Sequence, residues 1–189
     1  PILRSREACP RLSIEVLIPD TPANCQPLLV IIDARPEILN HNLETVRRMY
    51  PAVRPQAKFD RSVELLRRCK EAGLVTKTGI MVGIGERDDE VLDLMDNLRA
   101  AADTDILTIG QYLQPTRNHL PIDRWVTPET FARYREQGLA RGFNPTVGLS
   151  VSSTLGGMAR DAEGSAHRPP PRAPASARRP CRPAAAGPR

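Results

Sequence analysis

The sequence has few aromatic residues and no long hydrophobic run. Phe, Trp and Tyr together make up 4% of the 189 residues, so the core must be built mainly from aliphatic side chains. No apolar stretch approaches the roughly 18 residues that a membrane-spanning helix needs, and the first ten residues lack the apolar core of a secretory signal. We therefore expect a soluble protein with no membrane partner, and the length favours one domain.

Cysteine is also scarce, and its spacing matches no metal-ligand motif. The four cysteines are Cys9, Cys25, Cys69 and Cys181. They fit neither a C-x-x-C nor a C-x-x-x-C-x-x-C pattern. Disulfides are not expected without an export signal, and Cys69 falls in a helical pattern where a small buried hydrophobe would fit. The sequence thus predicts no metal ligands and assigns no catalytic residue.

Lysine is missing from the C-terminal quarter, which nevertheless carries the whole net charge of +5. Residues 144–189 contain seven Arg and two acidic residues, whereas residues 1–143 contain 20 basic and 20 acidic residues. The neutral body shows no basic face, and seven arginines scattered among prolines form no patch. Nucleic-acid binding is therefore disfavoured.

Composition also sets the domain limits. Residues 144–189 hold eight of the 19 prolines and almost no apolar periodicity, so we expect a disordered tail. Residues 12–143 alternate apolar runs with helical patterns and are expected to form the folded body. Residues 1–11 are expected to be an irregular N-terminal remnant.

The body reads as strands alternating with helices. Apolar and β-branched runs predict strands near residues 14–18, 38–41, 78–82 and 106–110. Continuous apolar strands separated by helices indicate a parallel β/α sheet. About four such units are too few for a closed eight-stranded barrel, so an open or partial barrel is expected.

Local signals predict where the helices begin and end. A short helix over residues 43–49 is expected to stop at Pro51, and Asp60 is expected to cap a helix that ends at Gly73. Three acidic residues at 88–90 open another helix, and Thr127 followed by Pro128 opens the last one. Pro22 and Pro27 interrupt the segment at 21–32, where a crossover helix would be expected.

Polar residues and glycines gather where the predicted strands end. In parallel β/α folds the carboxyl ends of the strands form the ligand site. The residues found there are Asn40, His41, Asn42 and Glu44, then Gly83, Gly85 and Glu86, and finally Gln111, Tyr112 and Gln114. Amides and carboxylates can bind a ribose or amino-acid group, and glycines let a flat ring approach the backbone. Each group also has a structural reading as turn, cap or backbone-binding residues.

Three stretches make the prediction sharper. Residues 39–44 (LNHNLE), 76–86 (TKTGIMVGIGE) and 106–116 (ILTIGQYLQPT) resemble lipoyl synthase, and the resemblance extends over most of residues 12–143. That family consists of radical S-adenosylmethionine (SAM) sulfurtransferases with a partial β/α barrel. Its members insert two sulfur atoms into an octanoyl chain on a lipoyl carrier domain, and use SAM and two [4Fe–4S] clusters.

The resemblance implies a set of cofactor-binding residues. Asn40, Asn42 and Glu44 match the motif near the SAM ribose and amino-acid end. Gly83, Gly85 and Glu86 belong to the glycine-containing strand beside the adenine, and Gln111 and Leu113 lie on the strand that flanks the adenine and substrate channel. A branched side chain at Gly83 or Gly85 is expected to damage SAM binding more than folding. The resemblance also implies a cytoplasmic location, or the mitochondrial matrix in a eukaryote.

The sequence departs from the family in its cysteines and its tail. Neither the C-x-x-x-C-x-x-C loop nor the second cysteine set of the family is present, so the barrel is expected to be incomplete at the N-terminal side. Residues 151–154 (VSST) match poorly the Arg-Ser-Ser-Tyr motif near the family's C-terminus. We expect the chain to be inactive alone. The alternative is a non-catalytic fragment or interaction module with at most residual SAM binding.

The cysteine spacing generates a first prediction. Anaerobic reconstitution with iron and sulfide should leave this chain without a stoichiometric [4Fe–4S] cluster, because a cluster needs three or four thiolates brought together. Thiolate-to-iron charge-transfer absorbance and an iron count measure the outcome. Stoichiometric iron accompanied by SAM cleavage would show that these four cysteines do form a ligand set.

Overall fold

The computed structural model describes residues 1–20 and 26–144. The described residues fall into two compact units, residues 1–12 in one, and residues 13–20 and 26–144 in the other. The first unit contains helix α1 (Ile2–Ala8) in its described part. From the sequence, residues 1–11 are expected to be irregular, but most of them form this helix. The tail predicted to be disordered, residues 144–189, lies outside the described residues except for Asn144.

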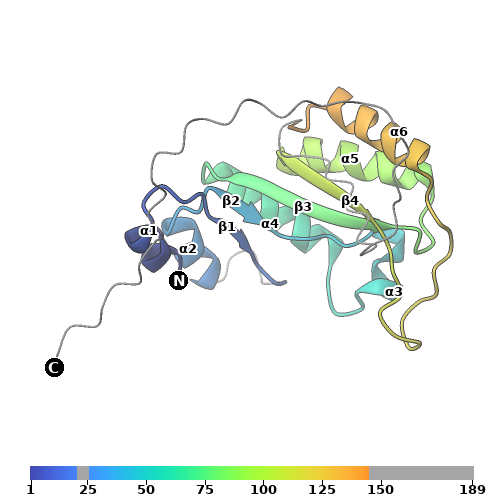
Figure 1. Cartoon of the computed structure of the whole chain (residues 1–189), viewed down its shortest axis with the longest axis horizontal. Helices are drawn as coiled ribbons and strands as arrows, with labels where there is room; N and C mark the ends of the chain where they lie inside the picture. The colour runs from blue at the N-terminus through green and yellow to red at the C-terminus, as the bar shows by residue number, and fades with distance from the viewer. Residues whose placement is uncertain (21–25, 145–189) are drawn as a thin grey trace, which may run out of the picture. The chain divides into compact units, whose positions relative to one another are not determined.

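Four strands of the second unit form one parallel sheet in the part of the chain that is described. They are β1 (Glu15–Leu17), β2 (Ile38–Asn40), β3 (Val75–Val82) and β4 (Ile106–Gln111), and they lie in the order β1-β2-β3-β4. Every neighbouring pair is parallel, with Leu39 opposite Thr76 and Gly79 opposite Thr108. This confirms the open parallel β/α architecture predicted from the sequence (Figure 1).

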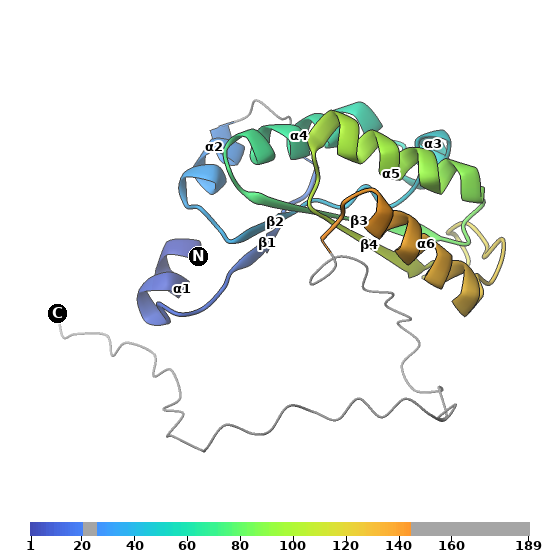
Figure 2. The ribbon, with the colours of Figure 1, turned by 90° about the horizontal axis from the view of Figure 1, so that it is seen from above.

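The helices lie mainly on one side of this sheet. Helices α2 (Gln26–Asp33), α4 (Phe59–Glu71) and α5 (Asp88–Ala102) cover the same face, and α6 (Pro128–Ala140) lies beside the β4 edge (Figure 2). A 3-10 turn, η1 (Arg47–Met49), leads directly into the short helix α3 (Tyr50–Val53). We call the other side of β1–β4 the open face.

The predicted helix ends are partly right. Thr127 Oγ1 accepts a hydrogen bond from Thr130 N at the start of α6, and Asp88, Asp89 and Glu90 occupy the first turn of α5. Gly73 follows α4 with a left-handed φ of 83°, as its C′ position requires.

Three predictions about helix ends were wrong. Pro51 lies in the first turn of α3 instead of ending a helix, and Pro27 lies in the first turn of α2, so a crossover helix does form. Proline is tolerated there because the first N–H groups of a helix have no intrahelical acceptor. Asp60 does not cap α4, which begins after Lys58; it lies in the first turn and forms an ion pair with Arg47 at 2.7 Å.

The core between sheet and helices is mostly aliphatic, as the composition predicts. The larger cluster joins β3 and β4 to α4 and α5 through residues such as Leu66, Ile80, Leu98 and Ile109. A smaller one joins β1 and β2 to α2 and α4 through Leu28, Leu39 and Leu65. Among the described residues, no helix has the length and hydrophobicity needed to cross a membrane.

The core generates a second prediction. Leu98→Ala removes a fully buried side chain of α5 and should lower the free energy of unfolding by about 2–5 kcal/mol. Leu29→Ala is the matched control, because Leu29 of α2 is 48% exposed and should cost much less. Urea unfolding followed by circular dichroism measures both, and equal losses would contradict this assignment of the core.

Candidate functional site

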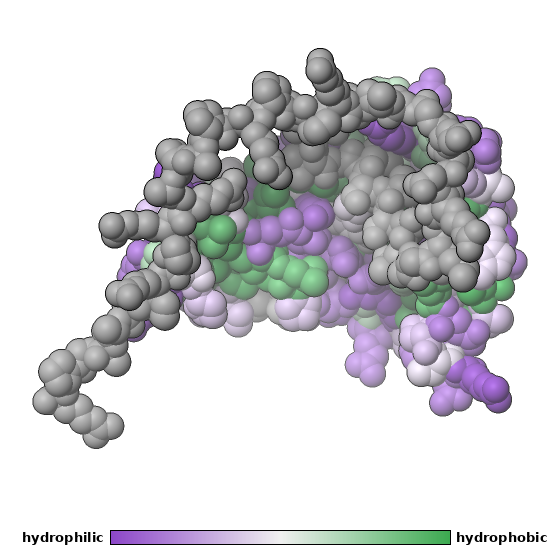
Figure 3. All heavy atoms as spheres, in the orientation of Figure 1, coloured by the Kyte–Doolittle hydropathy of each residue, from purple (hydrophilic) through white to green (hydrophobic). Residues whose placement is uncertain are grey.

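The open face differs from the helix-covered face because side chains alternate along β3. Ile80 and Val82 are buried among the helices. Lys77, Gly79 and Met81 have the opposite orientation, which places them on the open face. Their partners across the β3–β4 pairing are Ile106, Thr108 and Gly110. Hydrophobic and hydrophilic side chains lie side by side on this face where it is visible in Figure 3.

Three hollows lie at the carboxyl end of the strands. One of about 330 Å³ is lined by β3 and β4 together with Asn42, Glu44 and Leu113. A second of about 320 Å³ adjoins His41, Asn42 and Arg54, and a third of about 360 Å³ is lined by Arg54, Leu113 and mostly aliphatic neighbours. Glu44 lines all three, so the hollows lie next to one another, and we call them together the strand-end site.

Gly79 forms the floor of the strand-end site. A Cβ atom there would lie 2.7 Å from Thr108 Oγ1 and 2.9 Å from Asn42 Oδ1, closer than real contacts allow. The missing side chain therefore lets an amide and a hydroxyl lie directly over the strand. Gly110 of β4, opposite Met81, also has no side chain on this face. A surface that presents an amide and a hydroxyl close to the strand suits a planar, polar ring.

Glu44 extends the pairing of β2 with β3 in an unusual backbone conformation. Its φ is 70°, its N–H donates to Gly79 O at 2.9 Å, and its carbonyl accepts from Met81 N at 2.8 Å. A residue with a Cβ loses roughly 1–2 kcal/mol in this left-handed region. The two ladder bonds help to offset that cost, and they fix where the Glu44 side chain begins.

Asn40 lies on the open face but apart from the strand-end site. Its Nδ2 donates to Glu15 Oε1 at 3.0 Å, and Lys77 Nζ donates to the same oxygen at 2.8 Å. The Asn40 Oδ1 atom is buried and has no hydrogen-bond partner among the described residues. Asn40 is therefore part of a polar row across β1, β2 and β3.

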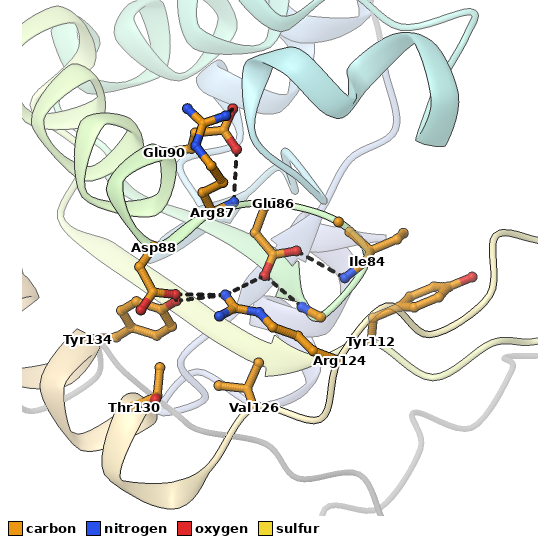
Figure 4. A network of polar contacts seen from close by, with 12 residues as sticks. Ile84, Glu86, Arg87, Asp88, Glu90, Tyr112, Arg124, Val126, Thr130 and Tyr134 are labelled. Carbon is orange, nitrogen blue, oxygen red and sulfur yellow. Dashed lines mark hydrogen bonds and ion pairs between the residues drawn. The ribbon is translucent and has the colours of Figure 1, made fainter.

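A buried network lies behind the turn that follows β3 (Figure 4). The Glu86 side chain is fully buried, and its two oxygens accept from Gly83 N at 2.7 Å and Ile84 N at 3.0 Å. Arg124 Nη2 donates to the same carboxylate at 3.1 Å. The Glu86 carboxylate thus replaces the missing ladder partners of the turn and fixes its shape.

Gln111 joins this turn to the segment before α6. Its Nε2 donates to Arg124 O at 3.2 Å, and its Oε1 accepts from Val126 N at 2.9 Å. Gly83 lies close to both partners of the first of these bonds and has a left-handed φ of 89°. A Cβ atom on Gly83 would lie 2.4 Å from Arg124 O. The sequence-based expectation for Gly83→Val needs correction, because the branched side chain would displace backbone and so damage folding first.

Asp88 links this network to α6. Its Oδ1 accepts from Tyr134 Oη at 2.7 Å and from Arg124 Nη2 at 2.7 Å, and Arg133 also pairs with the carboxylate. The hydrogen bond from Tyr134, aided by the two arginines, lowers the pKa of Asp88 below its ordinary value. Burial, together with the Asp88 charge, raises the pKa of Tyr134, which therefore remains a hydroxyl donor at neutral pH.

The predicted site residues thus separate into two groups. Asn42, Glu44, Gln111 and Leu113 line the strand-end site, whereas Asn40, Gly83, Gly85 and Glu86 are not among the residues that line its hollows. Sequence reasoning assigned no individual role to Gly79, Thr108 and Arg54. Gly79 carried a signal, because a glycine inside an apolar strand marks a close approach to the backbone.

No metal centre is found within residues 1–20 and 26–144. No group of three or more His, Cys, Asp or Glu side chains there could hold a metal ion. Cys69 is fully buried in α4, and burial raises the pKa of its thiol to about 11, so it remains protonated at neutral pH. This agrees with the structural role that its helical position suggested.

Comparisons with known proteins confirm the resemblance predicted from the motifs. The radical SAM superfamily profile matches residues 3–98. The lipoyl synthase of Rubrobacter xylanophilus is 52% identical over 141 residues, which cover 74% of this chain and 44% of that protein. The lipoyl synthase of Parabacteroides distasonis is 51% identical over 138 residues, or 73% of this chain and 49% of that protein.

The chain spans less than half the length of these curated relatives. Among solved structures, SuiB of Streptococcus suis matches 75% of this chain and 33% of its own, with a TM-score of 0.56 and 12% identity. That likeness concerns the fold alone.

The network behind the turn generates a third prediction. Glu86→Gln replaces an acceptor by an amide NH₂ that must face a backbone N–H, so the free energy of unfolding should fall by about 1–3 kcal/mol. The matched control is Glu136→Gln on the exposed side of α6, which should change it by no more than about 0.5 kcal/mol. Thermal unfolding measures both variants, and a Glu86→Gln protein as stable as the control would refute the role given to this carboxylate.

Proposed function

Because the chain belongs to the radical SAM superfamily, we propose that it is part of a lipoyl synthase and that its strand-end site binds SAM. The reaction proposed for the whole protein is insertion of two sulfur atoms into an octanoyl chain on a lipoyl carrier domain. The identity of about half the residues with curated lipoyl synthases, over nearly three quarters of this chain, supports the proposal. The carrier domain is the partner that follows from it.

The main support for the SAM assignment is the glycine floor, by which we mean Gly79 with the Asn42 and Thr108 side chains over it. Gly79 is the position at which a Cβ would meet the Asn42 amide and the Thr108 hydroxyl. A purine has a flat face and a polar edge, so it fits against the amide and the hydroxyl that lie over Gly79. The Asn42 amide can donate and accept, the Thr108 hydroxyl, which donates to Thr78 O at 3.2 Å, can accept, and the Glu44 carboxylate can accept from ribose hydroxyls or an ammonium group.

The bound cofactor would supply the radical chemistry by which hydrogen is removed from an unreactive carbon. The residues of this chain would hold its nucleoside and orient it on the sheet. The aliphatic hollow beside Met81 and Leu113 would exclude water from that end of the site. Iron–sulfur clusters are also implied by the family, but no group of three or more His, Cys, Asp or Glu side chains among the described residues fits one.

The glycine floor generates a fourth prediction. S-adenosylhomocysteine, a stable analogue of SAM, should shift the backbone amide signals of Glu44, Gly79 and Thr108 in ¹H–¹⁵N spectra of the whole chain. Gly79→Ala should weaken its binding about tenfold or more, because the new methyl group displaces the Asn42 and Thr108 side chains. The matched control is Val75→Ala, a change on the same strand and face at a residue that lines none of the three hollows.

Unfolding curves of both variants separate loss of binding from loss of fold. Shifts that cluster elsewhere, or equal affinity of the two variants, would contradict the SAM assignment.

A further inference from the structure

We propose that Arg54 is a positioning residue that sets the conformation of residues 42–44 and thereby places Asn42 and Glu44 in the strand-end site. Arg54 is the C-cap residue of α3, and its backbone N–H donates to Tyr50 O at 2.7 Å. The buried Tyr50 ring anchors the helix in the larger core cluster. The Arg54 side chain therefore begins from a fixed point, and it is only 20% exposed.

The guanidinium connects the site segment to a second fixed point. Nη1 donates to Asn42 O at 2.8 Å and to Leu43 O at 3.3 Å, while Nη2 donates to Asp20 Oδ2 at 2.8 Å. The ladder with β3 is joined by the N–H and carbonyl of the next residue, Glu44. Residues 42–44 are thus held by hydrogen bonds from Arg54 to residues 42 and 43 and by hydrogen bonds between β3 and residue 44.

Asp20 is itself held in place. Its Oδ1 accepts from Ser62 Oγ on α4 at 3.2 Å. The buried His41 Nδ1 lies 3.2 Å from Ile18 O and must donate to it, which leaves Nε2 without a hydrogen-bond partner among the described residues, although it lies 3.4 Å from Asp20 Oδ1. The Asp20 carboxylate therefore joins the end of β1 to α4, and Arg54 connects residues 42 and 43 to this point.

This support matters because Glu44 has a backbone conformation that a residue with a Cβ rarely adopts. Such a conformation persists only where its surroundings determine it fully. A planar fork can reach two carbonyls and a carboxylate together, whereas a lysine ammonium cannot. Arg54 also lines two of the three hollows, so replacing it would change the surface that a ligand contacts.

The test compares Arg54→Lys and Arg54→Met with Arg141→Lys in the whole chain. Lys keeps the charge beside Asp20, and Met keeps the aliphatic stem but no donor. Arg141 pairs with Asp96 and Gln137 at the end of α6, which makes it the matched control. The first measurement is amide hydrogen exchange at Glu44 and Met81, whose N–H groups form the ladder bonds around residue 44.

We expect exchange at both amides to be about tenfold faster in both Arg54 variants, with Leu98 in the core unchanged, and no change in Arg141→Lys. Affinity for S-adenosylhomocysteine should fall by a similar factor. Exchange like that of the wild type in Arg54→Lys would overturn the proposal, because charge alone would then suffice. So would equal acceleration at Leu98, which would indicate a general loss of stability.

The affinity measurement rests on the proposed function, but the exchange measurement does not. If the wild-type chain fails to bind the analogue, the SAM assignment fails, and exchange at Glu44 and Met81 still decides the role of Arg54.

Discussion

The candidate site depends on the parallel pairing of β3 with both β2 and β4. This pairing aligns the carboxyl ends of the strands, so residues that lie far apart in the sequence meet at one edge of the sheet. Because side chains alternate along β3, Ile80 and Val82 enter the aliphatic core while Gly79 faces the open side. A shift of one residue in this register would exchange the two faces and bury the polar residues.

The polar residues around this edge have different roles. Glu86 and Gln111 satisfy backbone groups of the turn after β3 and of the segment before α6, and this fixes the rim of the site. Asn42 and Thr108 lie over Gly79, where the Asn42 amide can donate or accept and the Thr108 hydroxyl oxygen can accept from a ligand. We propose Arg54 as a third kind of contribution, because it holds the backbone from which Asn42 and Glu44 project. Ligand binding therefore depends on more residues than those that touch the ligand.

The sequence predicted the strands and their parallel order because each strand is a continuous apolar run between helical patterns. It misjudged Pro51, Pro27 and Asp60 because these residue types are as common in a first turn as at a boundary. The resemblance placed Glu86 and Gln111 among the cofactor-binding residues. Their structural partners, Arg124 and Val126, come from later in the chain and are brought near only by the fold. Nor could the sequence reveal the left-handed Glu44 or the role of Arg54, since both depend on the tertiary position of Asp20 and β3.

The most direct test of the central claim is a crystal structure of the chain in complex with S-adenosylhomocysteine. We expect the adenine or ribose to lie over Gly79, with Asn42 and Thr108 as its hydrogen-bond partners. We also expect Glu86 and Gln111 to keep their bonds to the backbone of the rim. A nucleoside bound away from the open face, or a Glu86 carboxylate turned out of its turn to meet the ligand, would contradict this account.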